Sequence, residues 1–314
     1  MRDSADRGPQ YSDADHVALR RALAQCHGLN FDRIICGAGS MEIMSQIGQS
    51  YLEPGRGLVM SQYGYRLMKT LAEIAGADVV LTPERDLTCD VDALLAGVTP
   101  ATTMVFCVNP NNPTGTVLPF SEIRRLRANL RDDVMLILDA AYGEFVDMPD
   151  YQTGETLVDE GTNTVVLRTF SKVHGLAGLR VGWAYAHDDV IATLQKMRLP
   201  GSIGAQAQAG ATASVNDPAH VAQSRNAVIA LRERFIAQLR QFGLEPVPSH
   251  ASFVLVRIPD HVGMDSEALY QAVKARGILL RRVGNFGLDG YIRISIGAPH
   301  EMAALTDVLT DILG

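Results

Sequence analysis

The chain lacks the excess of positive charge that a nucleic-acid-binding surface requires. Its 314 residues carry 28 lysines and arginines against 35 acidic residues, which gives a net charge of −7. No segment approaches the roughly 18 consecutive apolar residues needed to span a membrane, and residues 1–11 are charged and polar rather than signal-like. We therefore expect no nucleic-acid partner, no membrane contact and a cytoplasmic location.

Cysteine is scarce, and no Cys-x-x-Cys or His-Glu-x-x-His spacing is present among the four cysteines and eight histidines. The spacing therefore indicates neither a disulfide framework nor a metal site. Cys36 and Cys107 fall in apolar segments, which predicts buried free thiols in a reducing compartment. The remaining composition, with 47% hydrophobic and 20% charged residues, is typical of a globular protein with a substantial core.

Short apolar segments alternate with amphipathic segments from about Arg33 onward. The segments predicted to be strands are 33–37, 57–60, 78–81, 103–108, 134–139, 164–169 and 179–186, and those predicted to be helices are 40–52, 67–75 and 121–129. The segment 134–138 is apolar throughout, as in a central strand covered on both faces. The alternation predicts an α/β fold with a mostly parallel wound sheet.

The pattern changes near Asn216, where Asp217 can cap a long helix that has Pro218 in its first turn and ends near Phe242. Beyond it we predict strands at 252–258, 278–283 and 291–296 and helices at 266–276 and 300–313. Three parts follow from this pattern: an N-terminal arm and helix in 1–30, a large domain in 31–216, and a smaller α+β domain in 217–314 that includes the long helix.

Polar residues follow the ends of two predicted strands. Asp139 ends the most apolar strand, and Asn112 lies in the segment Asn-Pro-Asn-Asn-Pro-Thr-Gly after the strand that ends at Val108. In wound sheets, ligands bind outside the carboxyl ends of the strands. A cap or a tight turn explains either feature alone, but seven specified residues in a row favour a binding crevice.

Lys172 follows a third predicted strand, in the segment Thr-Phe-Ser-Lys-Val-His-Gly. Most lysines lie on solvated surfaces, whereas a desolvated lysine near other cations can form a Schiff base with an aldehyde. Arg180, eight residues further on among glycines and apolar residues, offers a fork for a phosphate. Isolated surface charges are the alternative, and the small and apolar neighbours disfavour it.

Residues 36–42, Cys-Gly-Ala-Gly-Ser-Met-Glu, run from a strand through glycines into a helix, where backbone N–H groups can hold an anion. The segment half-matches a dinucleotide-binding fingerprint. However, Glu42 replaces the third glycine, and the stretch near Val59, at the ribose distance, is apolar. A nicotinamide dehydrogenase is therefore disfavoured, and it would leave Lys172 unexplained.

The segments NPNNPTG, DAAY, TFSK with GLAGLRVG, and RISIG occur in the order found in class I/II aminotransferases. From about Tyr11 to its end, the chain most resembles the histidinol-phosphate aminotransferase subfamily, with a shortened N-terminus. The resemblance implies an aspartate aminotransferase-like fold and pyridoxal 5'-phosphate as cofactor. It also implies an amino acid, histidinol-phosphate-like or aromatic, and a 2-oxo acid as substrates, and a homodimer whose smaller domain closes over the substrate.

The resemblance also implies roles for individual residues. Lys172 would bind the cofactor covalently and move a proton, Asp139 would pair with the pyridine nitrogen, and Tyr142 would join Asn112 in holding the ring oxygen. The residues expected at the phosphate are Ser40, the Met41 backbone, Ser171, Arg180 and, in the partner subunit, Tyr11. Tyr63 would stack on the ring, with a core aromatic as the alternative.

Two arginines would bind substrate in the same scheme. Arg293, in RISIG, would bind the α-carboxylate as a bidentate pair, with a salt bridge across the domain interface as the alternative. Arg281, which precedes a second arginine, would meet the distal substrate group of phosphate-using members. This sequence begins just before the point that resembles the family's YPD segment and does not contain the family's N-terminal arm. Either the start lies further upstream, or the arm is absent and substrate enclosure and dimer exchange would differ.

Two functional alternatives share the cofactor. One is decarboxylation, β-elimination or cyclisation of an amino acid, which differs only in the bond that is broken. The other is a catalytically weakened relative that acts as a binding partner. Retention of Tyr142, Lys172 and Arg293 favours amino transfer.

Overall fold

A computed structural model describes residues 9–314 of the chain, so part of the predicted N-terminal arm, residues 1–8, lies outside the described residues. The larger of its two main sheets has the strand order β1-β9-β8-β7-β6-β2-β3. The strands are β1 (Ile34–Gly37), β2 (Gly57–Ser61), β3 (Asp78–Thr82), β6 (Thr102–Val108), β7 (Met135–Asp139), β8 (Thr164–Thr169) and β9 (Gly182–Ala186). Neighbouring strands from β3 to β8 are parallel, and only β9 runs against its neighbours. The predicted α/β fold with a mostly parallel sheet is confirmed.

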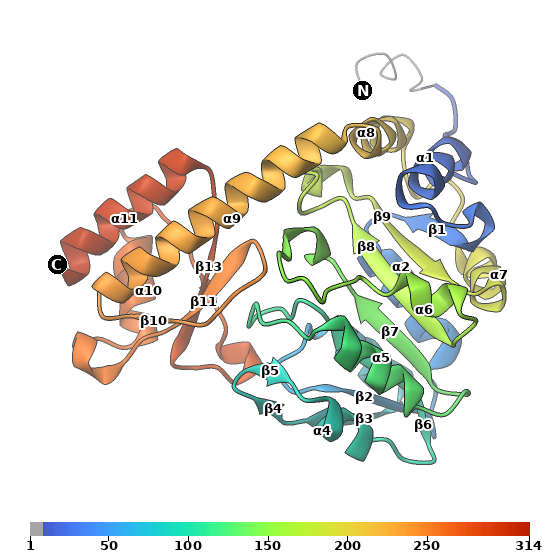
Figure 1. Cartoon of the computed structure of the whole chain (residues 1–314), viewed down its shortest axis with the longest axis horizontal. Helices are drawn as coiled ribbons and strands as arrows, with labels where there is room; N and C mark the ends of the chain where they lie inside the picture. The colour runs from blue at the N-terminus through green and yellow to red at the C-terminus, as the bar shows by residue number, and fades with distance from the viewer. Residues whose placement is uncertain (1–8) are drawn as a thin grey trace.

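Both faces of this sheet are covered, because its central strands are apolar on both sides. In β7, Leu136 and Leu138 join one buried cluster, while Met135 and Ile137 join the cluster on the opposite face. The first cluster contains residues of α1 (Val17–His27), α4 (Val91–Ala96), α5 (Phe120–Ala128), α6 (Glu155–Asp159) and α8 (Ala205–Val215); the second contains residues of α2 (Ser40–Tyr51), α3 (Leu67–Ala75) and α7 (Asp188–Met197). Period-two alternation in the strands thus builds a three-layer arrangement (Figure 1).

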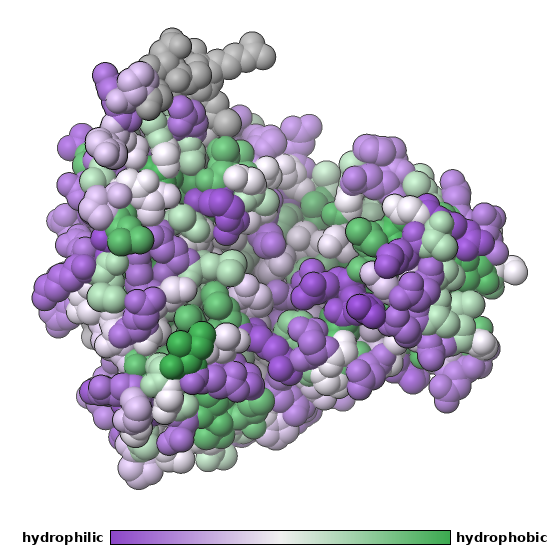
Figure 2. All heavy atoms as spheres, turned by 180° about the vertical axis from the view of Figure 1, so that it is seen from behind, coloured by the Kyte–Doolittle hydropathy of each residue, from purple (hydrophilic) through white to green (hydrophobic). Residues whose placement is uncertain are grey.

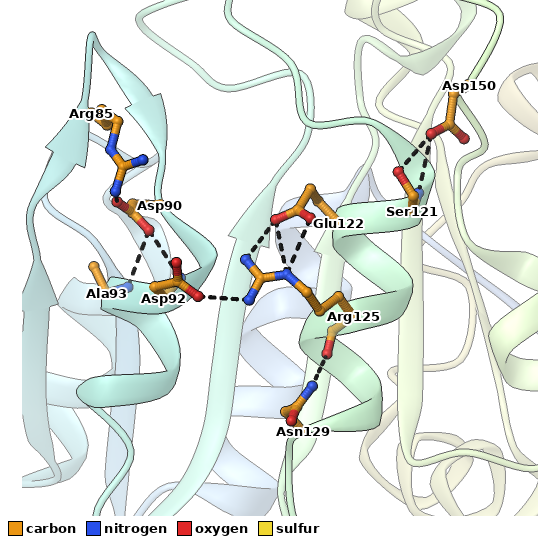
Figure 3. Close-up of polar contacts among 9 residues, drawn as sticks. All are labelled: Arg85, Asp90, Asp92, Ala93, Ser121, Glu122, Arg125, Asn129 and Asp150. Atoms are coloured by element: carbon orange, nitrogen blue, oxygen red, sulfur yellow. Dashed lines mark hydrogen bonds and ion pairs between the residues drawn. The ribbon is translucent and has the colours of Figure 1, made fainter.

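Charged residues hold the outer surfaces of α4 and α5 together (Figure 3). Arg125 lies 2.6 Å from Asp92 of the neighbouring helix and 2.7 Å from Glu122 of its own. Asp90 caps α4 by accepting from the N–H of Asp92 and also pairs with Arg85. Because most of these groups are solvent-exposed, the pairs add little to the free energy of unfolding, and the buried apolar clusters carry the stability.

A second sheet, with the order β10-β11-β13-β12, lies beside the first and is antiparallel throughout. Its strands are β10 (Glu245–Pro246), β11 (Phe253–Arg257), β12 (Arg281–Arg282) and β13 (Tyr291–Ser295), and they pack with α9 (Pro218–Gln241), α10 (Ser266–Lys274) and α11 (Pro299–Leu313) around a separate core. The long helix α9 joins the two parts, as Figure 1 shows. As predicted, Asp217 caps it by accepting from the N–H of His220.

Two predicted strands are shorter than expected. The strand expected from Leu179 begins only at Gly182, because Ala177–Leu179 form a 3-10 turn and Arg180 is left-handed with a φ of 52°. The strand expected at 278–283 is reduced to Arg281–Arg282, since Leu279 is 73% exposed. Both segments precede the first residue of a strand, so their apolar composition does not reflect ladder pairing.

The surface matches the charged composition. Figure 2 shows hydrophilic residues over much of the reverse face, with apolar residues in scattered patches and a hollow in the outline between the two parts. Cys36 and Cys107 are buried and free, as predicted. Within residues 9–314, no helix combines the length and the apolarity that crossing a membrane requires.

Candidate active site

A cavity of about 210 Å³ opens at the carboxyl ends of β6, β7 and β8, beside the start of α2. Its lining contains Ser40, Met41, Tyr65, Val108, Asn112, Asp139, Ala141, Tyr142, Thr169, Ser171, Lys172, Ala177 and Arg180. The sequence segments that carry these residues lie far apart in the chain. They meet here because β6, β7 and β8 are parallel neighbours, whose carboxyl ends share one edge of the sheet.

Asp139 is a buried carboxylate with an incomplete set of partners. It is the last residue of β7, is 4% exposed, and accepts a hydrogen bond of 3.1 Å from the N–H of Ala141. Burial raises its pKa to about 6, although the Ala141 N–H and the charge of Lys172 act in the opposite direction. A buried carboxylate of this kind is stabilised by a cationic hydrogen-bond donor, which a protonated pyridine nitrogen would supply.

Lys172 lies just beyond β8, where a turn closed by the Gly175 N–H and the Lys172 carbonyl aims it at the cavity. Its Nζ atom is 5.1 Å from the ring centroid of Tyr142. Tyr142 is itself buried and meets Phe253 edge-on at 5.1 Å. The lysine and Asp139 therefore share one cavity, as the predicted cofactor site requires.

The opposite end of the cavity fits a phosphate. The N-terminus of α2 begins at Ser40, and the guanidinium of Arg180 donates to Ser171 Oγ at 3.2 Å and to the Ala177 carbonyl at 2.9 Å. Gly39 has a φ of 82°, and a Cβ there would lie 2.4 Å from Arg180 Nη2. A helix N-terminus with an arginine and two serine hydroxyls is a typical anion site.

Gly182→Ala is expected to weaken cofactor binding at least about tenfold, because the new Cβ would lie 2.2 Å from the backbone nitrogen of Ser40 and displace the anion site. Gly178→Ala is the matched control, since a Cβ there meets nothing within 4 Å. Titration of each variant with pyridoxal 5'-phosphate, followed by absorbance, measures the effect. Equal affinities of the two variants would contradict this placement of the phosphate.

Arg293, in β13 of the second sheet, contacts Asn112 of the cavity lining. Its Nη1 donates to Asn112 Oδ1 at 2.6 Å, and its guanidinium stacks on Phe253 at 4.6 Å. Burial lowers its pKa, the neighbouring Tyr142 raises it, and Arg281 lowers it further. Its Nε is buried without a partner, and none of the described ion pairs involves it. A substrate carboxylate fits such a donor better than the interface salt bridge considered as the alternative.

The two adjacent arginines of β12 differ in their surroundings. Arg282 lies 3.1 Å from Glu267 and stacks on Tyr270 at 5.0 Å. Arg281 lies opposite Arg293 in the antiparallel strand register, and its positive charge acts to lower the pKa of both Arg293 and Tyr65. Arg281 therefore shares a face of the sheet with Arg293, whereas Arg282 is engaged with Glu267 and Tyr270; neither Arg281 nor Arg282 is among the residues that line the cavity.

Two tyrosines of one loop differ in their surroundings. Tyr65 lines the cavity, whereas Tyr63 packs against an apolar cluster that includes Val283 and Phe286. The stacking of Tyr63 on the cofactor ring stays a prediction, and Tyr65 is a lining residue that the sequence analysis did not name. Tyr11 is fully exposed, away from its own chain's cavity. The sequence signal for Tyr65 was available, since it lies two residues after Tyr63 in the same loop.

Electrostatic and steric features of the cavity together fit pyridoxal 5'-phosphate. Asp139 suits the ring nitrogen, Lys172 the aldehyde, and the start of α2 with Arg180 the phosphate. Among residues 9–314, no cluster of three or more His, Cys, Asp or Glu side chains is placed to hold a metal ion.

Comparison with known proteins agrees with this chemistry. The family described as aminotransferase class I and II matches residues 3–312. The chain is 44% identical to the histidinol-phosphate aminotransferase of Rhodospirillum rubrum, over 98% of this chain and 83% of the relative. It is 41% identical to that of Paramagnetospirillum magneticum, over 100% and 86%. The crystal structure of histidinol-phosphate aminotransferase from Sinorhizobium meliloti in complex with pyridoxal-5'-phosphate superimposes with a TM-score of 0.91 at 29% identity, covering 99% of this chain and 85% of that one.

Proposed function

The chain belongs to the class I and II aminotransferases and is a pyridoxal-phosphate-dependent aminotransferase, and from this premise we propose that its amino donor is histidinol phosphate or a close analogue. The amino acceptor is a 2-oxo acid. The observation that carries the choice of donor is Arg281, a second guanidinium beside Arg293 in the strand register. Two cations in this position suit a dianionic phosphate as well as a carboxylate. The relatives named histidinol-phosphate aminotransferases support the same donor.

Each residue of the cavity has a separate role in the proposed reaction. Pyridoxal 5'-phosphate, when bound, supplies an electron sink for the carbon next to the amino group. Lys172 would hold the cofactor through its amine and, when that amine is free, would move the proton at the substrate Cα. The Asp139 carboxylate would hold the proton on the ring nitrogen. Asn112 and Tyr142 would hold the ring oxygen, and Ser40, the Met41 backbone, Ser171 and Arg180 would hold the phosphate.

Substrate anions are bound from the side of the second sheet. Histidinol phosphate carries a phosphate ester where an amino acid carries its carboxylate, so one site must accept both anions. Arg293 provides the fork for the carboxylate, in place of its present bond to Asn112. Arg281 adds a second charge at the same edge, which favours the dianion.

Arg293→Ala is expected to raise the KM for the amino acid or oxo acid at least about tenfold, because a charge-assisted bidentate contact is lost. Cofactor affinity should remain within about twofold of wild type, since the phosphate site is built by other residues. Steady-state kinetics and cofactor titration measure the two quantities separately. An unchanged KM would remove Arg293 from the substrate site.

Arg281→Ala is expected to raise the KM for histidinol phosphate roughly tenfold or more, and the KM for glutamate by much less, because the dianion depends on the second cation. Arg282→Ala is the matched control: the neighbouring residue carries the same charge but is engaged with Glu267 and Tyr270. If the two variants respond equally to histidinol phosphate, the assignment of the phosphate dianion to Arg281 is wrong.

We also propose the assembly and location of the enzyme. The two sheets with their separate cores support a large domain in 31–216 and a small domain in 217–314 that closes over the substrate. Full exposure of Tyr11 leaves it available to the phosphate site of a partner subunit, which supports a homodimer. The buried free thiols Cys36 and Cys107 suit a reducing cytoplasm.

A panel of amino donors tests the choice of substrate. Purified enzyme is mixed with histidinol phosphate, aromatic amino acids and glutamate, and the change of the cofactor spectrum is followed for each. We expect histidinol phosphate to give the highest kcat/KM. A clear preference for phenylalanine or tyrosine would instead establish the aromatic amino acids as the physiological class.

A further inference from the structure

Beneath the cavity lies a buried cluster of three charges that the proposed mechanism does not use. Arg168, in β8, is 6% exposed and stacks on Trp183 at 5.3 Å. Its Nη2 donates to Glu144 at 2.8 Å, and its Nη1 donates to Glu155 at 2.7 Å. The side chains of the two carboxylates are 14% and 15% exposed, so they are almost equally buried.

The two carboxylates belong to different parts of the fold. Glu144 lies in the 3-10 turn η3 (Gly143–Phe145), which follows directly on Tyr142. Glu155 begins α6, outside the cavity. Arg168 itself stands four residues before Lys172 in the chain. The guanidinium therefore ties the turn that follows Tyr142 to β8, the strand that precedes Lys172, whereas its bond to Glu155 ties β8 to the start of α6.

Close packing leaves η3 little freedom around this contact. A Cβ on Gly143 would lie 2.6 Å from Thr153 Cγ2 and 2.9 Å from the hydroxyl oxygen of Tyr151. That Tyr151 hydroxyl donates to the Asn109 carbonyl at 2.8 Å, in the loop that carries Asn112. Tyr151 thus contacts both segments proposed to hold the ring oxygen, the turn after Tyr142 and the loop that carries Asn112.

Burial of three charges is difficult to explain by stability alone. Removal of charged groups from water costs more than most ion pairs return, and well-packed apolar residues are often at least as stable in such positions. An arginine between two fixed carboxylates does define a geometry, because the planar guanidinium can donate hydrogen bonds only in certain directions. Burial would lower the pKa of Arg168, and the two carboxylates raise it above its usual range. The other titratable groups facing the cluster are His27, Tyr151 and His174.

We propose that Arg168 and Glu144 are positioning residues that hold Tyr142 in place against the ring oxygen of the cofactor. They act through the length of the Glu144 side chain, which sets the distance between η3 and β8. This inference rests on the proposed function, because it uses the role of Tyr142 at the ring oxygen. If Tyr142 moves away from that oxygen, their hydrogen bond is weakened. The visible absorption band of the bound cofactor then changes at a higher pH.

Two matched substitutions test the proposal. Glu144→Asp and Glu155→Asp each keep the charge and shorten the side chain by one methylene, against the same guanidinium and at equal burial. We expect Glu144→Asp to raise the midpoint of the cofactor band by roughly half a pH unit or more and to lower kcat roughly tenfold, with little change in KM. Glu155→Asp should leave the midpoint unchanged, with a comparable effect on the thermal unfolding temperature.

Glutamine variants separate length from charge. Glu144→Gln keeps the length, so its midpoint shift should be smaller than that of Glu144→Asp and larger than that of Glu155→Gln. This glutamine pair also decides the matter if an aspartate variant does not fold. Equal midpoints in the variants at 144 and 155, or a larger shift for Glu144→Gln than for Glu144→Asp, would overturn the proposal. Failure of the proposed function is distinct, since the panel of amino donors would then show a preference for a donor other than histidinol phosphate, whatever the midpoints of these variants.

Discussion

Replacement of Lys172 by alanine abolishes the visible absorption band of the bound cofactor and lowers amino transfer by more than about 10⁴-fold. The expected loss is this large because one amine performs two tasks, covalent attachment of the cofactor and movement of the proton at the substrate Cα. Among the described residues, Lys172 is the one lysine in the lining of the cavity. Absorbance spectra and initial rates of the purified variant measure both effects.

Lys196→Ala is the matched control for this experiment. Lys196 is an exposed residue of α7, remote from the cavity lining, so its replacement should leave both the spectrum and the rate unchanged. Reduction of the wild-type protein with borohydride should add the mass of the cofactor to the peptide that contains Lys172. A normal visible band in Lys172→Ala would contradict the assignment of the covalent site.

Asp139→Asn is expected to lower kcat roughly 10²- to 10³-fold, because a charged contact in a buried site is lost, at a cost of about 3–5 kcal/mol. The ring nitrogen then no longer has a carboxylate that holds its proton. Cofactor should still attach to Lys172, since the amine and the phosphate site remain. Rates and cofactor content of the variant, measured on the same preparation, test both parts of this expectation.

The same substitution should stabilise the protein when the cofactor has been removed. Burial raises the pKa of Asp139 from 3.8 to about 6 in the folded chain. The contribution of this group to stability is therefore complete below about pH 4 and is lost as the pH rises through about 6. The difference corresponds to about 3 kcal/mol. Cofactor-free Asp139→Asn should thus be more stable than cofactor-free wild type at pH 8, with equal stabilities near pH 4.

Denaturant unfolding at several pH values measures this difference. A wild-type protein that is as stable as the variant at pH 8 would show that Asp139 has another partner in the cofactor-free state. A gain in stability joined to a loss of activity is the expected signature of a carboxylate that is buried for function.

Most of the large sheet was predictable because its strands are marked by local patterns. The apolar segment 134–138 and the helix cap at Asp217 each depend on residues adjacent in the chain. The reversed direction of β9 was not predictable, since nothing local distinguishes an antiparallel strand buried on both faces. Helices α7 and α8 were also missed. In α8 the alternation of alanine with small polar residues leaves almost no amphipathic pattern.

Candidate site residues were predictable where a motif surrounds them, as for Asp139 and Lys172. The partners of those residues were not predictable, because they depend on contacts between distant segments. The contact between Arg293 and Asn112 spans 181 residues, and that between Arg168 and Glu144 joins β8 to the 3-10 turn η3. Tyr65 was not predicted to line the cavity, because no motif singles it out from Tyr63 in the same loop, which packs against the cluster of Val283 and Phe286.

A single-turnover experiment with the cofactor-loaded enzyme tests the central claim most directly. The enzyme is mixed with histidinol phosphate without any oxo acid, and the released cofactor and carbon products are identified by chromatography. Amino transfer predicts one equivalent of pyridoxamine phosphate per active site, with the matching carbonyl product. Recovery of all the cofactor as pyridoxal phosphate with this donor and with glutamate, whether or not carbon dioxide is released, would contradict it.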